Sequence, residues 1–381
     1  MGISNKINHS LIPTDAIKII KTLKAKNFSC FLVGGCIRDI LLKKKPKDFD
    51  IVTSATPSEI RKAIPRAYII GKRFRLVLAQ RSNQQYEIST FRQQNQEQDT
   101  ELLGEDNTFG TPEEDALRRD FTINALLYDP VQKELRDYTN GLEDLKIGQI
   151  KMIGDPFIRM FEDPVRILRA IRLTHKIHFN LDTPIKQAII KHAALLKQSP
   201  LSRIREELLK FLKLPDPSIA FVTCHDLGVL KVISPSLNKD FKHFIYQSSK
   251  FLLFKTQDLY SEEIKPEELF AKLFFAYIYE NPYYEQTIAL LSKKSLVELN
   301  AQFGTMLSQE WGCFKYEQEN ILKALKLQVA LNQAPNYTSH ELHTVMHRKT
   351  LKLAIKMALQ FDLLNSEAKS FWLIQNALQK T

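Results

Sequence analysis

The spacing of the apolar residues changes near Met152, and this change constrains the fold more than any other feature of the sequence. Before it, short runs rich in β-branched and aromatic residues alternate with stretches of helical periodicity, as in mixed α/β domains. The runs predict strands at residues 30–33, 49–53, 68–70, 75–80 and 86–91. Helices are predicted from Gly35, from a capping box formed by Thr56 and Glu59, and over residues 112–126.

From residue 155 onward the apolar residues recur at helical spacing, with breaks at prolines. The sequence therefore predicts an α/β head over residues 1–152 and an all-α remainder. We divide the remainder into a helical neck, 153–212, and an all-helical body, 213–381, which is expected to support RNA.

The charge of the chain favours a polyanionic partner. Lys and Arg number 54 against 43 Asp and Glu, a formal net charge of +11. A solvated lysine-rich surface would explain the same excess. No apolar run reaches the roughly 18 residues of a membrane span, and the N-terminal residues lack the apolar core of a secretory signal. The four cysteines have no metal-binding spacing, so we expect reduced thiols in a cytoplasmic protein without membrane partners.

Two glycines and two aspartates carry the chemistry. Gly34 and Gly35 stand where a predicted strand becomes a helix, and backbone N–H groups at such a junction favour phosphate. Arg38, one turn into the helix, could contact the same anion. Asp48 and Asp50 are two residues apart on the next predicted strand, so their side chains would point to one face. Neighbouring carboxylates repel each other unless a cation lies between them, and Mg²⁺ prefers such oxygen ligands.

Each of these signals has a simpler explanation when taken alone. The Asp pair could be a buried structural pair or an exposed strand face, and a Gly-Gly pair by itself is a weak signal. Their proximity in the sequence favours a nucleotidyltransferase site, in which Mg²⁺ bridges a triphosphate and an attacking hydroxyl.

The chain resembles the class II branch of the DNA polymerase β-type nucleotidyltransferases, which comprises tRNA CCA-adding enzymes and bacterial poly(A) polymerases. The resemblance covers about residues 31–208 and lies in four stretches: GGCIRD at 34–39, DFD at 48–50, RRDFTINA at 118–125 and EDPVRILR at 162–169. It implies a DNA polymerase β-like mixed sheet with helices in the head, and two Mg²⁺ ions held by Asp48 and Asp50.

The RRDFTINA motif is expected around the ribose of the nucleotide and the floor of the active site. The resemblance assigns Arg119 and Asn124 to nucleotide binding and Asp120 to a third catalytic carboxylate, with the orientation of an arginine as the alternative task of Asp120. On the predicted helix, Asp120 and Asn124 would share a face. Glu87, on a predicted strand, is a rival for the third carboxylate, and a charge on an edge strand would explain it equally well.

The EDPVRILR motif is expected to recognise the incoming base. Asp163, Arg166 and Arg169 would lie on one side of a predicted helix. A carboxylate acceptor and a guanidinium donor on a rigid face can read the Watson–Crick edge of a base without a template strand. An ordinary Asp–Arg pair within the helix is the alternative.

Residues 69–76, IIGKRFRL, resemble the bacterial poly(A) polymerases more than the CCA-adding enzymes. Lys72, Arg73 and Arg75 in this stretch could contact RNA phosphates. The resemblance thus implies a template-independent enzyme that adds AMP from ATP to RNA 3′ ends. Two alternatives stay open: a CCA-adding tRNA nucleotidyltransferase, and a non-catalytic RNA-binding protein on a transferase scaffold, against which the presence of both Asp48 and Asp50 argues.

Overall fold

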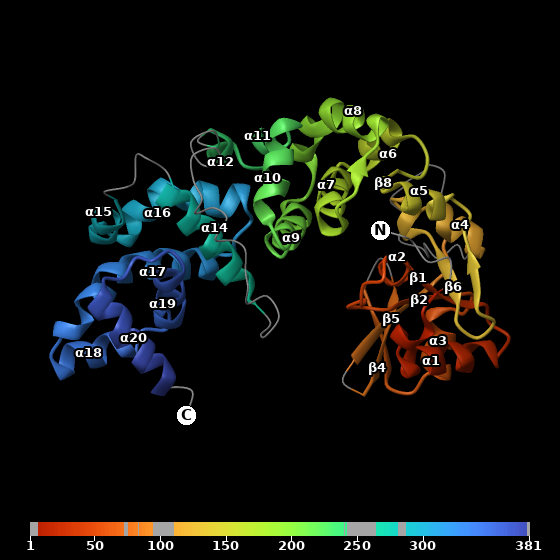
Figure 1. Cartoon of the computed structure of the whole chain (residues 1–381), viewed down its shortest axis with the longest axis horizontal. Helices are drawn as coiled ribbons and strands as arrows, with labels where there is room; N and C mark the ends of the chain where they lie inside the picture. Colours follow the sequence, from red (N-terminus) through yellow and green to blue (C-terminus); the bar gives the residue numbers. More distant parts are fainter. Residues whose placement is uncertain are drawn as a thin grey trace. The chain divides into compact units, whose positions relative to one another are not determined.

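The computed structural model describes residues 7–71, 75–82, 84–93, 110–239, 241, 264–280 and 287–378. The chain divides into two compact units. The head unit comprises Met1–Arg159 and Phe179–Ile185, and the helical unit comprises Met160–His178 and Lys186–Thr381. Figure 1 draws both units with their element labels. The predicted three-part division at residues 152 and 212 stays a prediction.

The head unit is built on a mixed sheet, which in the described residues has seven strands in the order β3-β4-β5-β2-β1-β6-β7. Strands β2 and β5 pair in parallel, and the other neighbours pair antiparallel. Strand β1 reads CFLV and is buried throughout, as expected for a central strand. The strands are β1 Cys30–Val33, β2 Asp50–Thr53, β3 Ala67–Ile70, β4 Leu76–Arg81, β5 Gln84–Thr90, β6 Leu127–Asp129 and β7 Glu134–Arg136.

Short helices connect and cover these strands. The capping box predicted at Thr56 and Glu59 is confirmed at the start of α3, and a second one joins Thr111 and Glu114 at the start of α4. The helices of the head are η1 His9–Leu11, α1 Thr14–Lys24, α2 Gly35–Leu41, α3 Pro57–Ala63, α4 Pro112–Leu117, η2 Thr122–Asn124 and α5 Gly141–Ile147. Strands β8 Gln149–Ile150 and β9 Asn180–Leu181 form a small parallel pair.

The predicted helix over residues 112–126 is wrong, because α4 ends at Leu117. Phe121 is extended and bridges to Met152, and the Thr122 N–H donates to the Lys151 carbonyl at 3.1 Å. The backbone at Thr122 packs directly against Gly141. Only a glycine fits at position 141, because a Cβ there would come within 2.3 Å of the Thr122 carbonyl oxygen. Tertiary pairing has overridden local helix propensity at this point.

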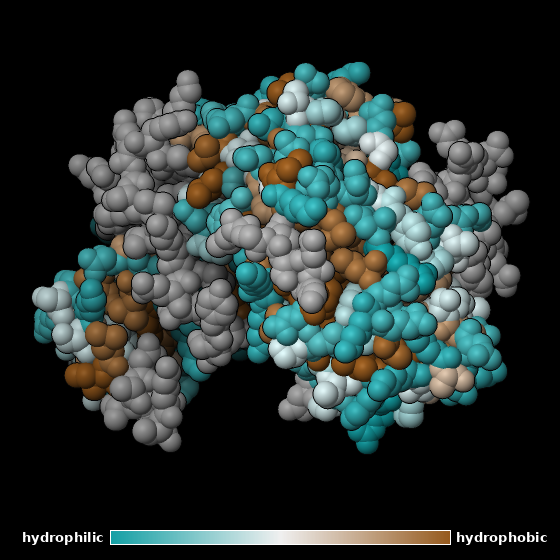
Figure 2. All heavy atoms as spheres, turned by 45° about the vertical axis from the view of Figure 1, so that its right-hand side comes forward, coloured by the Kyte–Doolittle hydropathy of each residue, from teal (hydrophilic) through white to brown (hydrophobic). Residues whose placement is uncertain are grey.

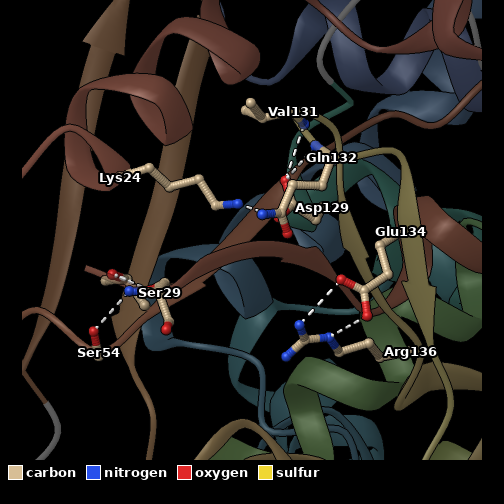
Figure 3. A network of polar contacts seen from close by, with 9 residues as sticks. Lys24, Ser29, Ser54, Asp129, Val131, Gln132, Glu134 and Arg136 are labelled. Carbon is tan, nitrogen blue, oxygen red and sulfur yellow. Dashed lines mark hydrogen bonds and ion pairs between the residues drawn. The ribbon is translucent and has the colours of Figure 1, made fainter. Parts of the chain in front are cut away.

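The core of the head packs between the sheet and the segments that follow α4. One buried cluster joins apolar side chains from β1, β2 and β6 with others from α4 and the loops: Phe31, Val33, Val52, Phe91, Ala116, Ala125, Leu127 and Ile153. Figure 3 shows a polar tie nearby, in which Lys24 at the end of α1 contacts the buried Asp129 carboxylate. Asp129 also accepts from the Val131 N–H at 2.9 Å, so α1 is linked to the turn after β6.

The helical unit contains the last residues of α6, all of α7, most of α8 and the described helices from η3 to α20. Trp311 and Trp372 are buried within it and are core residues. Its elements are α6 Pro156–Glu162, α7 Val165–Ile177, α8 Thr183–His192, η3 Ala193–Gln198, α9 Leu201–Leu212, α10 Pro217–Asp226, α11 Leu230–Ile233, α12 Pro235–Lys239, α14 Pro266–Glu280, α15 Thr287–Lys293, α16 Leu296–Thr305, η5 Met306–Glu310, α17 Lys315–Gln333, η6 Ala334–Asn336, α18 Ser339–Met346, α19 Leu351–Gln360 and α20 Ser366–Leu378.

The four cysteines are free and buried, as the sequence predicts. None of the helices among the described residues combines the length and the apolar character needed to cross a membrane. On the face that Figure 2 presents, apolar side chains are scattered among hydrophilic ones.

Candidate active site

The turn between β1 and α2 lies directly against an aspartate. Gly34 has φ +81° and ψ −140°, a conformation that residues with a side chain rarely adopt. A Cβ on Gly34 would stand 3.5 Å from Asp50 Oδ2 and 3.8 Å from Arg119 Nη1. The glycine therefore brings bare backbone beside both a carboxylate and a guanidinium.

Three carboxylates gather at this place, and we call Asp48, Asp50 and Glu87 the carboxylate cluster. Asp50 opens β2, and the parallel register sets it opposite Glu87 of β5. Asp48 lies two residues before Asp50, outside the strand rather than on it as predicted, and the buried Phe49 between them leaves both aspartates on the exposed side.

The electrostatics of Asp50 reflect this crowding. Loss of solvent and the charges of Glu87 and Asp48 raise the pKa of Asp50 to about 6, although Arg119 pulls it in the opposite direction. Like charges held together in this way are typical of sites that bind a cation. Of the two candidates for a third carboxylate, Glu87 is the one that pairs in register with Asp50. For Asp120, whose backbone carbonyl accepts from the Ile153 N–H at 3.1 Å, a catalytic role stays a prediction.

The carboxylate oxygens of Asp48 and Asp50 fit Mg²⁺ in their chemistry. Within the described residues, no set of three His, Cys, Asp or Glu side chains is arranged to hold a metal ion by itself. Mg²⁺ at nucleotide sites commonly uses one or two carboxylates and completes its shell with water and substrate phosphates. Asp48 and Asp50 supply that number of ligands.

Arg119 is held at the site by a residue that the sequence analysis did not single out. Asp115 is wholly buried in α4 and accepts from both Arg118, at 2.7 Å, and Arg119, at 2.9 Å. Burial opposes its ionisation, but the Arg119 and Arg118 guanidinium groups keep the pKa of Asp115 below its usual range. Asp115 therefore fixes the orientation of Arg119 beside Gly34. The four-residue spacing between Asp115 and Arg119 is the sequence signal that could have indicated this pairing.

Arg38 lies beneath the turn rather than on its surface. The side chain is buried, and its guanidinium donates to Asp39 Oδ1 at 2.5 Å and to Asn124 Oδ1 at 2.6 Å. A Cβ on Gly35 would stand 3.3 Å from Arg38 Nη2, so the group packs under the first residue of α2. This arrangement links α2 to the RRDFTINA motif and favours a positioning role for Arg38 and Asn124. Their contact with a nucleotide stays a prediction.

The residues expected to recognise the base lie in the helical unit, but not on one helix. Helix α6 ends at Glu162 and α7 begins at Val165. Pro164 lacks an N–H and disfavours helical backbone at Asp163, which explains the break. Asp163 is therefore at a junction, whereas Arg166 and Arg169 lie three residues apart on α7. The prediction of one continuous helical face is wrong for Asp163.

Helix α9 supplies partners for this motif that the sequence analysis missed. Arg203 donates to Asp163 Oδ2 at 2.7 Å, while Asp163 Oδ1 accepts from the Val165 N–H at 3.2 Å. The buried Glu207 accepts from Arg172 at 2.7 Å and lies 3.8 Å from Arg169. We call these residues of α7, α9 and the junction the α7–α9 network.

In the α7–α9 network, carboxylates pair with groups of opposite charge. Burial opposes the ionisation of Glu207, but Arg172 and Lys210 bring its pKa below the usual value. Arg166 of α7 donates at 3.2 Å to Glu162, the last residue of α6. Of the predicted RNA contacts in the head, Lys72 and Arg73 lie outside the described residues, and Arg75 is exposed just before β4.

Two parts of the chain match models of known protein families. Residues 30–151 match the family model described as Poly A polymerase head domain. Residues 178–241 match the model described as Probable RNA and SrmB-binding site of polymerase A. These matches support the class II poly(A) polymerase and CCA-adding enzyme family, to which the chain is similar. The resemblance inferred from the motifs is thereby confirmed.

Curated proteins named as poly(A) polymerases and CCA-adding enzymes match part of the chain. Poly(A) polymerase I of Haemophilus influenzae is 40% identical over 237 residues, which are 60% of this chain and 52% of that protein. Poly(A) polymerase I of Salmonella typhi is 36% identical over 245 residues, 62% of this chain and 53% of that protein. The CCA-adding enzyme of Lactobacillus helveticus is 39% identical over 195 residues, 51% of this chain and 49% of that protein. The chain spans about half the length of the curated relatives it matches.

Solved structures of the family extend the likeness in fold. The Bacillus stearothermophilus CCA-adding enzyme in complex with CTP superimposes with a TM-score of 0.65 at 22% identity, over 94% of this chain and 82% of that chain. The Thermotoga maritima CCA-adding enzyme complexed with tRNA gives a TM-score of 0.57 at 20% identity, over 100% of this chain and 86% of that chain. The predicted fold class, an α/β nucleotidyltransferase head followed by helices, is confirmed.

Proposed function

We propose that this protein is a polynucleotide adenylyltransferase that adds AMP from ATP to RNA 3′ ends without a template. The observation that carries the proposal is the carboxylate cluster, set beside a glycine turn and an arginine that a buried aspartate holds in place. Such a site combines what a nucleotidyl transfer needs: ligands for a divalent cation, and groups that bind the triphosphate.

In the reaction, the RNA 3′ oxygen attacks the α-phosphorus of ATP, the bond from that phosphorus to the bridging oxygen breaks, and pyrophosphate leaves. Asp48 and Asp50 would hold Mg²⁺, which supplies positive charge to the triphosphate and lowers the pKa of a bound hydroxyl. The Gly34 backbone and Arg119 would orient the triphosphate. Asp115 keeps Arg119 in position, and Glu87 adds negative charge that favours cation binding.

For selection of adenine, we propose Asp163 and Arg166, with Arg169 completing the pocket. Arg203 would act on Asp163 by fixing its carboxylate, since their atoms lie 2.7 Å apart. In the head, Arg119 and Asn124 would bind the nucleotide and Asp120 would be a third catalytic carboxylate, as the resemblance implies. The helical body would support RNA, and a cytoplasmic location stays part of the proposal.

Two observations favour poly(A) addition over CCA addition. The relatives named Poly(A) polymerase I match at 36–41% identity over 217–245 residues, against 36–39% over 195–214 residues for those named CCA-adding enzyme. The basic stretch at residues 69–76 suits a grip on RNA phosphates that ignores sequence.

The experiment that tests the proposal is primer extension with each nucleotide supplied separately. We expect a ladder of many A additions on a generic oligo(A) primer. Addition limited to C, C and then one A, on a tRNA that lacks its terminal CCA, would assign the CCA-adding activity instead. No addition to either RNA would leave the non-catalytic RNA-binding protein as the function.

A further inference from the structure

Two large aromatic side chains stand in solvent at the start of α17. Phe314 is 55% exposed and Tyr316 is 57% exposed. Their rings stack on each other, with centroids 6.2 Å apart and planes inclined by 24°. Two half-open rings side by side leave apolar surface in water, and covering that surface is favourable. We call Phe314 and Tyr316 the aromatic platform.

The platform is held by a buried ion pair. The Arg205 guanidinium lies 4.3 Å from the centroid of the Phe314 ring and donates to Glu317 Oε1 at 2.6 Å. Glu317 is wholly buried, and its other oxygen accepts from the Phe314 N–H at 2.7 Å. One carboxylate thus fixes both the backbone of Phe314 and the cation against its ring. The platform is pre-organised by these contacts.

A glycine brings this corner onto α9. Gly312 has φ +69°, and a Cβ there would stand 3.1 Å from Arg205 Cβ and 3.3 Å from Leu201 Cγ. Residues 312–314 therefore pass directly over the first turns of α9. That helix lies inside the segment, 178–241, which matches the family model for a probable RNA-binding site. The platform is continuous with the part of the chain that the comparison associates with RNA.

We propose that Phe314 and Tyr316 of the helical unit stack the unpaired bases of single-stranded RNA. Base–aromatic stacking tolerates any sequence, and a cation beside the ring adds to it. Lys315, the exposed residue between Phe314 and Tyr316 in the sequence, adds a positive charge that favours a backbone phosphate. The net charge of +11 agrees with a polyanionic ligand. The inference rests on RNA being the substrate, as proposed above.

The test measures binding, not catalysis, on the full chain. The double variant Phe314→Leu and Tyr316→Leu keeps apolar side chains but removes both aromatic rings. We expect its affinity for a labelled oligo(A) to fall at least about fivefold, the lower bound for the loss of one stacked base. Binding of a sugar-phosphate oligomer without bases should not change. The slope of affinity against salt should also stay the same, because stacking releases no counterions.

Two controls separate stacking from damage to the fold. Phe314→Tyr with Tyr316→Phe keeps both rings and should bind oligo(A) as the wild type does. Val297→Ala alters an exposed apolar side chain on α16 and should leave both oligomers unaffected. If the double leucine variant bound oligo(A) as tightly as the wild type, or lost both oligomers equally, the platform would not stack bases.

The outcome is independent of the proposed reaction. A platform that stacks oligo(A) in a protein that extends no primer would contradict the adenylyltransferase and leave this inference standing. Normal extension of oligo(A) by the double leucine variant, with unchanged affinity for RNA, would support the adenylyltransferase and contradict base stacking. The exposed rings would then be a surface for a protein partner.

Discussion

The carboxylate cluster of the head and the α7–α9 network of the helical unit use the same residue types in opposite ways. In the head, Asp48, Asp50 and Glu87 lie together, and the pKa of Asp50 rises to about 6. In the network, arginines from α7 and α9 meet the carboxylates of Asp163 and Glu207, and the pKa of Glu207 is lowered. A cluster of like charges is typical of a site that binds a ligand of opposite charge, whereas pairs of opposite charge stabilise the fold.

The largest expected effect is the loss of catalysis when the cluster is broken. Asp50→Ala should reduce turnover by at least about a thousandfold, on the order of 4 kcal/mol of transition-state stabilisation, because a metal ligand is removed. Single-turnover primer extension measures this. Asp362→Ala, which removes an exposed carboxylate paired with Lys369, is the control and should extend normally. A folded Asp50→Ala protein with near-normal activity would contradict the metal assignment.

Breaking the matched network should instead reduce stability. Glu207→Gln leaves Arg172 and Lys210 facing a neutral amide, and we expect the free energy of unfolding to fall by about 2–3 kcal/mol, since one partner of a buried pair is lost. Urea denaturation followed by circular dichroism measures it. Glu206→Gln, at an exposed neighbouring position on the same helix, should change it little. Equal effects of the two variants would show that the network does not stabilise the unit.

Arg166 tests whether the network also serves recognition. Arg166→Ala should lower the preference for ATP over the other ribonucleotides, and the loss of one bidentate base contact costs roughly 1–3 kcal/mol of discrimination. The ratio of kcat/KM values for the four nucleotides measures it. A uniform slowing with all four would instead assign Arg166 to the structure of the helix, through its pair with Glu162.

The smallest effect is the pH dependence of stability without metal. The folded pKa of Asp50, about 6, lies above its unfolded value, so the native state gains stability from protonation below the unfolded pKa and loses it as pH rises through about 6. In a chelator, Asp50→Asn should therefore melt higher than the wild type at pH 8, by roughly a few °C. This difference in melting temperature should vanish by about pH 4, because the Asp50 side chain of the folded wild type is then protonated and as neutral as the asparagine of the variant. A difference that grows toward low pH would contradict the raised pKa.

The sequence by itself determined the features that depend on neighbours along the chain. The strand before Gly34, the helix after it, the capping box at Thr56 and the spacing of the four motifs identify the family and the nature of its head. Each involves residues within a few positions of one another, where backbone sterics and local hydrogen bonds set the outcome.

Only the tertiary structure decided which distant groups meet. The parallel pairing of β2 with β5 sets Glu87 opposite Asp50, and the backbone bridge to Met152 ends the helix that local propensity predicts beyond Leu117. Helix packing brings Arg203 to Asp163, 40 positions away in the chain. Charges that far apart find each other through the packing of whole elements, and the energy that selects such packing comes from burial, which a linear pattern of residues does not specify.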